Sequence, residues 1–315
     1  MTLPVPYKIH TNGKLLLTGE YFVLDGAQAL AIPTQKGQLF EATPLEHADY
    51  LHWKSFDNEG LLWFEAKFSL QRLDIIESSD EVVALQLEYI LKEAKKQSKR
   101  TLEEGKGLLV ETRLEFPRKW GLGSSSTLIA AISQWFGVNA FDLLFNSFGG
   151  SGYDIACALS GEPLLYQLQN RKPIIYTCQF SPPFKNQLYF VYLGKKQDSR
   201  QGIQHYRKII QKDKNLIGEI NDLTAAFVTA KDLSTFENCI NEHEAIVSRA
   251  IELTTAKTLH FKDFPGAIKS LGAWGGDFVL ATSQSSRKET KKWFKQKGFD
   301  TVFSYEEMVF NSSSQ

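Results

Sequence analysis

The chain has 315 residues, of which 43% are apolar and 23% are charged, and its 36 lysines and arginines equal its 36 aspartates and glutamates. This is the composition of an ordinary soluble globular protein, and the neutral balance gives no sign of a nucleic-acid partner or of an anionic membrane surface. No apolar run approaches the roughly 20 residues of a membrane span, and the N-terminus has no signal-peptide pattern.

The length predicts two domains that share a cleft, because single hydrophobic cores stop growing at about 250–300 residues. Ser181-Pro182-Pro183 is the best linker, so we expect domains at residues 1–180 and 181–315. The three cysteines are odd in number, far apart and without a Cys-x-x-Cys motif. This pattern excludes a disulfide framework and favours a reducing cytoplasm.

The first elements along the chain are marked by turn and capping residues. Asn12-Gly13 predicts a hairpin between strands at 7–11 and 14–18, because this dipeptide is the strongest short hairpin signal. A second turn is expected at Asp25-Gly26. Asp80 predicts the start of a helix that continues to Gln97, with apolar residues at helical spacing on its inner face.

A strand, a glycine-serine loop and a helix follow at residues 108–137. Residues 108–116 alternate between apolar and mostly charged side chains, which is the period of a strand with one buried face. The loop Gly121–Thr127 leads into a helix that Gly137 would end. Because a helix N-terminus presents unpaired N–H groups and a partial positive charge, this segment predicts an anion site, typically for phosphate.

Two more glycine-rich segments lie in the rest of the chain. Gly149–Gly152 enters a helix at 153–159, and 271–277 leads into a strand. The other predicted elements are strands at 164–168, 173–177, 187–193 and 299–304, and helices at 214–231, 233–256 and 287–297. Glu242-His243-Glu244 is interpreted as a solvated helix face.

The Gly121–Thr127 loop has a structural and a functional interpretation. A tight strand-to-helix connection needs nothing more than its glycines, but serine hydroxyls beside a phosphate can also ligate magnesium. The loop is not a Walker A motif, because no Gly-Lys-Ser/Thr ends it, and Ser126 stands where a dinucleotide fingerprint has its third glycine.

Three segments in order resemble the GHMP kinase superfamily. Pro117-x-x-x-Gly121-Leu122-Gly123-Ser124-Ser125 is similar to its ATP loop, and Gly13–Gly26 is similar to its N-terminal motif, in the Gly-Glu-Tyr form of phosphomevalonate kinases. Gly272–Asp277 resembles the C-terminal glycine motif, and Gly152-Tyr153-Asp154-Ile155-Ala156 resembles the signature of a bacterial subgroup. The resemblance implies an α+β fold, with a ribosomal S5 domain 2-like N-terminal domain that binds ATP and a ferredoxin-like C-terminal domain.

The resemblance also implies roles for matching positions. Asp154 would take the proton from the acceptor hydroxyl, and Lys14 would lie beside it, where an ammonium keeps the carboxylate ionised. ATP would bind Gly121, Leu122, Gly123, Ser124, Ser125 and Ser126, and Ser124 or Ser125 would ligate Mg²⁺. The substrate would lie near Glu20, Tyr21, Ser151, Gly152, Ser199, Arg200, Gly275 and Gly276.

The sequence departs from the family at two positions. Leu143 stands where mevalonate kinases carry a magnesium-binding glutamate, and the nearest acid is Asp142. Trp274 replaces a small residue of the C-terminal glycine motif.

The resemblance favours an ATP-dependent kinase that transfers a phosphoryl group to a small acidic acceptor, phosphomevalonate first and mevalonate second. A homoserine or sugar kinase, a diphosphomevalonate decarboxylase and a non-catalytic nucleotide-binding sensor remain as alternatives, and a dinucleotide oxidoreductase is more distant. We expect a monomer or a homodimer with no nucleic-acid or membrane partner.

Overall fold

The computed structural model describes residues 1–103, 105–195, 199–209 and 214–310. The chain forms two compact units: unit 1 is residues 1–13, 36–118 and 122–159, and unit 2 is residues 14–35, 119–121 and 160–315. This division differs from the predicted boundary at residue 180. The long strands β1 (Tyr7–Leu16) and β2 (Ala29–Pro44) each contribute residues to both units, and residues 160–180 belong to unit 2, where residues 164–166 pair with the first residues of β2.

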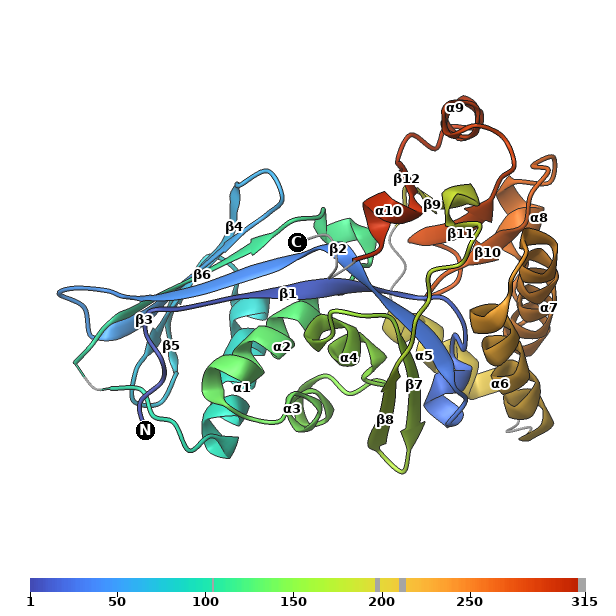
Figure 1. The fold of residues 1–315 in the computed structure, drawn as a ribbon. Helices are drawn as coiled ribbons and strands as arrows, with labels where there is room; N and C mark the ends of the chain where they lie inside the picture. The colour runs from blue at the N-terminus through green and yellow to red at the C-terminus, as the bar shows by residue number, and fades with distance from the viewer. Residues whose placement is uncertain (104, 196–198, 210–213, 311–315) are drawn as a thin grey trace. The chain divides into compact units, whose positions relative to one another are not determined.

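Unit 1 is a sheet packed against helices (Figure 1). Its strands lie in the order β5-β4-β3-β6-β2, with β1 paired to β2, and β3 runs parallel to β6. The further elements are β3 (Tyr50–Phe56), β4 (Leu62–Ser69), β5 (Ile75–Ser78), α1 (Glu81–Gln97), β6 (Leu108–Leu114), α2 (Ser124–Phe136), α3 (Ala140–Ser147) and α4 (Tyr153–Leu159). A short 3-10 helix, η2 (Arg118–Trp120), precedes α2.

The sequence signals at the ends of α1 and α2 are confirmed. The Asp80 carboxylate accepts a hydrogen bond from the Val83 amide and caps α1. Gly137 ends α2 in the left-handed conformation, with φ 68°. Both helices bury apolar faces in one core with the sheet, in which the Phe40 ring lies 5.4 Å from the Trp135 ring. This packing fixes where the N-terminus of α2 lies in unit 1.

Unit 2 contains a four-stranded antiparallel sheet in the order β10-β11-β9-β12. It also contains the antiparallel pair β7 and β8, which joins the first residues of β2. The elements are η1 (Phe22–Asp25), β7 (Leu164–Gln169), β8 (Lys172–Thr177), η3 (Lys185–Gln187), β9 (Leu188–Tyr192), α5 (Ser199–Ile209), α6 (Lys214–Thr229), α7 (Leu233–Ile251), α8 (Ala256–His260), β10 (Ile268–Ser270), β11 (Phe278–Thr282), α9 (Arg287–Gln296), β12 (Val302–Ser304) and α10 (Tyr305–Met308).

The predicted hairpin at Asn12-Gly13 is wrong, because β1 runs through both residues as one strand. Asn12 and Gly13 are buried, and the Thr11 hydroxyl donates a hydrogen bond to the Gln38 carbonyl of β2. Pairing with β2 therefore overrides the local turn preference. Among the described residues, no helix combines the length and the apolar character needed to cross a membrane.

Candidate functional site

The N-terminus of α2 in unit 1 has the features of an anion site. Its N-cap is Gly123, which has φ 93° and provides no side-chain acceptor for the first amides of the helix. Of the serines that follow, Ser124 is half-buried, Ser125 is exposed and Ser126 is buried. A glycine N-cap leaves the helix-terminal N–H groups available to a ligand, so the predicted phosphate chemistry fits this helix end.

Asp154 lies against the same helix end. It is in the first turn of α4, which Gly152 enters with φ 88°. The Ser126 hydroxyl donates a hydrogen bond of 2.5 Å to Asp154 Oδ2, and Asp154 Oδ1 accepts from the Ile155 amide at 3.1 Å. Asp154, the candidate base, therefore contacts the first turn of α2 within unit 1, although Ser126 and Asp154 are 28 residues apart in sequence.

Unit 2 holds Gly121, the first residue of the loop. Lys14 Nζ donates a hydrogen bond of 2.8 Å to the Gly121 carbonyl. A Cβ atom at Gly121 would lie 2.3 Å from Asp277 Cγ, so any larger residue there would displace this carboxylate. Asp277 directly follows Gly275 and Gly276, and the C-terminal glycine motif thus contacts the start of the ATP loop. The pairing of Lys14 with Asp154 stays a prediction.

Two predicted substrate residues occupy a turn of unit 2. Glu20 is 0% exposed, and its Oε1 accepts a hydrogen bond of 2.7 Å from Lys269 Nζ. This burial argues against the direct substrate contact predicted for Glu20. Tyr21 has φ 64° and stacks on Tyr206, with ring centroids 5.4 Å apart. Ser199 and Arg200 begin α5, and their side chains lie outside the described part of the structure.

The sequence interpretation of Glu242-His243-Glu244 is wrong for two of the three residues. His243 is 0% exposed and Glu244 is 4% exposed, whereas Glu242 is exposed. Their burial could have been predicted, since they continue the inward face of α7 that Phe236 and Ile240 begin. Together with Glu20 and Lys269 they form what we call the buried charge cluster.

The protonation states of this cluster follow from its burial. Burial lowers the pKa of His243 well below its usual range, so the imidazole is neutral and its Nε2 accepts a hydrogen bond from the Gly19 amide at 3.0 Å. Burial raises the pKa of the Glu244 carboxyl to about 8, against the opposing effect of the Lys269 ammonium. Burial also raises the pKa of Glu20, and Lys269 again opposes the shift. Glu244 therefore keeps its proton to a higher pH than an exposed carboxyl does, and it lies beside a neutral histidine.

A magnesium ion would depend mainly on the nucleotide for its ligands. The described residues contain no group of three His, Cys, Asp or Glu side chains that could hold a metal. Leu143 is fully buried and Asp142 is exposed on α3, so neither replaces the glutamate of mevalonate kinases. The oxygens of Ser124, Ser125 and Asp154 are the protein ligands that α2 and α4 offer, and Mg²⁺ accepts such oxygens together with phosphates and water.

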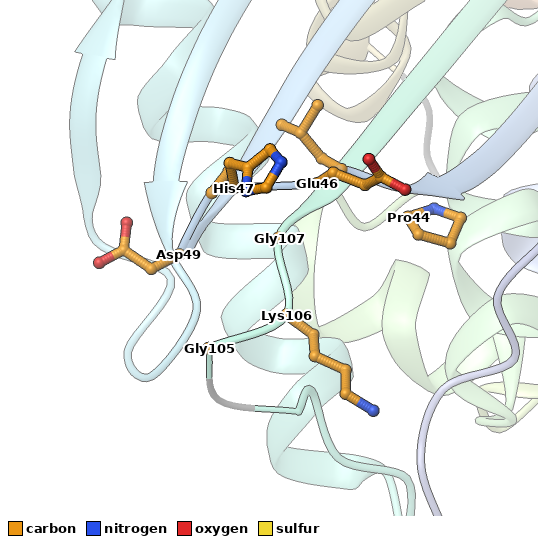
Figure 2. A pocket seen from close by; sticks show the side chains of 9 residues that line it. Pro44, Glu46, His47, Asp49, Gly105, Lys106 and Gly107 are labelled. Carbon is orange, nitrogen blue, oxygen red and sulfur yellow. The ribbon is translucent and has the colours of Figure 1, made fainter.

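A separate pocket lies in unit 1 between residues 44–49 and 105–107 (Figure 2). It contains none of the predicted site residues. Figure 2 shows the carboxylates of Glu46 and Asp49 pointing in different directions, with Lys106 directed away from both. The pocket therefore presents no converging set of ligand groups.

The sequence matches no protein-family profile and no curated relative. Solved structures do match over nearly the whole chain. Mevalonate kinase from Methanococcus jannaschii is 15% identical, with a TM-score of 0.70, over 97% of this chain and 98% of that chain. Phosphomevalonate kinase from Streptococcus pneumoniae, in complex with phosphomevalonate and AMPPNP, is 16% identical, with a TM-score of 0.70, over 95% and 99% of the two chains.

Galactokinase from Lactococcus lactis, complexed with galactose, is 14% identical, with a TM-score of 0.66, over 97% of this chain and 93% of that chain. At these identities the likeness is one of fold. The chain has the two-domain α+β fold of the GHMP kinases, which confirms the predicted fold class.

Proposed function

We propose that this protein is an ATP-dependent kinase of the GHMP type that phosphorylates a small acidic acceptor. The observation that carries the proposal is the 2.5 Å hydrogen bond between Ser126 and Asp154. It brings a carboxylate to a helix N-terminus whose glycine cap leaves amides available to a phosphate. Phosphoryl transfer requires mainly positioning and charge neutralisation, and this arrangement supports both.

In the proposed reaction, the first amides of α2 bind the phosphates of ATP and Asp154 accepts the proton of the acceptor hydroxyl. Lys14 supplies positive charge near the transferred group. Ser124 or Ser125 would hold Mg²⁺, which neutralises charge on the phosphate oxygens when it is bound.

Phosphomevalonate is the acceptor that we favour, and mevalonate is the second choice. The support is the Gly19-Glu20-Tyr21 and Gly275-Gly276-Asp277 strings, which resemble those of phosphomevalonate kinases, and the fold likeness to a phosphomevalonate kinase. The fold likeness to galactokinase keeps a sugar kinase as the alternative. The other alternative is a non-catalytic nucleotide-binding sensor, which would bind ATP without turnover of any acceptor.

The test is ADP release with mevalonate, phosphomevalonate, homoserine and simple sugars as acceptors. Asp154→Asn should lower kcat by at least about 100-fold, the lower range for loss of a general base, with little change in ATP affinity. Asp142→Asn is the matched control, because Asp142 is an exposed first-turn aspartate on α3, the preceding helix of the same unit. Near-wild-type turnover of Asp154→Asn would remove this residue from the mechanism.

A further inference from the structure

Two consecutive side chains of α7 each bind the backbone of a different functional segment. His243 Nε2 accepts a hydrogen bond from the Gly19 amide at 3.0 Å, and Glu244 Oε1 accepts one from the Ser270 amide at 3.0 Å. Glu244 Oε2 also lies 3.0 Å from the Ser270 hydroxyl. Gly19 begins the turn that carries Tyr21, and Ser270 ends β10, directly before the glycine segment 271–277. One helix thus supports both segments from inside unit 2.

A buried ion pair links the same two segments directly. Lys269 Nζ lies 2.7 Å from Glu20 Oε1, and both side chains are 0% exposed. Burial raises the pKa of Tyr21, and the backbone of Trp274, within the glycine segment, opposes this shift. The N-terminal turn is therefore tied to β10 through Glu20, next to the point where the glycine segment begins.

The geometry of the turn explains why it needs this support. Tyr21 has φ 64°, a left-handed conformation that bulky residues rarely adopt. Such strain persists only where the surroundings over-determine it, and it is concentrated at functional sites. The space at Gly19 is also limited, since a Cβ atom there would lie 2.8 Å from the Ala29 side chain.

We propose that His243 and Glu244 are positioning residues, which hold the Gly19–Tyr21 turn and the 271–277 segment in one fixed relation. Through these segments they set where Tyr21 and Asp277 stand, and Asp277 in turn contacts Gly121 of the ATP loop. Both side chains are buried in unit 2, so we expect them to act through these segments and not by contact with a ligand. The inference rests on the proposed kinase function for its effect on catalysis, but the structural link can be tested without turnover.

The first experiment measures amide hydrogen exchange in the full chain for His243→Leu, which removes the acceptor, and for His243→Gln, which places an oxygen near the position of Nε2. We expect His243→Leu to raise exchange about tenfold in residues 17–21, the effect of losing one buried hydrogen bond. His243→Gln should restore most of the protection. Glu242→Gln is the matched control, since Glu242 is the exposed neighbour on α7.

A second pair of variants tests the other segment. Glu244→Leu should raise exchange in residues 268–277, and Glu244→Gln should leave it near the wild-type value, because its amide oxygen can still accept from Ser270. Peptides from α1 in unit 1 serve as the internal reference. If a leucine variant fails to fold, His243→Asn or Glu244→Asp replaces it. The shorter side chain moves the acceptor away from the backbone amide and remains polar.

The kinetic arm separates positioning from general stability. The leucine variants should lower kcat by about 10- to 100-fold, as small misplacements in active sites do, with ATP KM almost unchanged and with recovery in the glutamine variants. If amide exchange in the leucine variants matches that in Glu242→Gln, the proposed link between α7 and the two segments is wrong. Faster local exchange with full kcat would overturn the positioning role. If the wild-type protein shows no turnover with any acceptor, the proposed function fails, and exchange alone decides whether the link exists.

Discussion

Lys269 carries its ammonium at a position with no exposed surface, and Glu20 is its nearest carboxylate. Glu244 Oε1 is 3.8 Å from the same nitrogen, and the neutral His243 completes the cluster. A buried charge is tolerated when it is paired and hydrogen-bonded, and removal of one partner is far more harmful than replacement of both. We therefore expect the loss of Lys269 alone to destabilise the protein more than the replacement of Lys269 and Glu20 together.

Lys269→Met should destabilise the protein by about 3–5 kcal/mol, because it leaves Glu20 buried without a cation. Glu20→Gln should be milder, since Glu244 can ionise and become the partner of Lys269. The double variant Lys269→Met/Glu20→Gln should recover much of the loss. Denaturant unfolding of the wild type and the three variants gives the free energies of a double-mutant cycle. If the effects of the two single substitutions add up in the double variant, Lys269 and Glu20 are not paired.

At the scale of elements, the predicted ATP loop is held from both of its ends. Gly121 lies against Asp277, and Ser126 binds Asp154 at the start of α4. The helix end is thus defined by contacts with segments that are distant in sequence. The strand-loop-helix pattern predicts the loop, but these contacts, each within its own unit, hold its two ends.

Gly121→Ala should impair ADP release far more than its backbone strain alone explains, because its Cβ would meet the Asp277 carboxylate. The control is Gly298→Ala, since Gly298 also has a positive φ but has open space around its Cβ position. That control should show only the strain of about 1–2 kcal/mol that a left-handed alanine brings. Equal effects of both variants on stability and on kcat would refute a specific role of the close approach.

At the scale of the whole molecule, the buried cluster makes stability depend on pH. Burial raises the pKa of Glu244 from 4.5 to about 8 in the folded chain. The folded protein therefore keeps a proton that the unfolded chain releases above its ordinary pKa. The contribution of Glu244 to stability is fully present below about pH 4.5 and is lost as the pH rises through about 8.

The free energy of unfolding of the wild-type protein should fall, relative to that of Glu244→Gln, between about pH 5 and pH 8. The slope should reach at most about 1.4 kcal/mol per pH unit, the value for one bound proton. Denaturant titrations of both proteins across this range measure the difference, with Glu242→Gln as the control that should retain the wild-type slope. Parallel curves for the wild type and Glu244→Gln would mean that Glu244 is ionised in the folded state.

Much of the local structure could be predicted from the sequence. Asp80 marks the start of α1 and Gly137 the end of α2, because caps satisfy backbone groups within a few residues of themselves. The turn preference of Asn12-Gly13 is equally local, yet it fails, because pairing with β2 stabilises an extended conformation there. The polarity of His243 and Glu244 predicts an exposed helix face, although the periodicity of α7 places them inward.

The helix ends, the glycine segments and the order of the motifs are predictable from the sequence, since each depends on residues near one another in the chain. The folded structure was needed to show that Ser126 contacts Asp154, that Asp277 lies beside Gly121, and that Glu20 pairs with Lys269. These contacts join residues far apart in sequence. They exist because sheet pairing and core packing bring the segments together, and no local pattern encodes the distance between them.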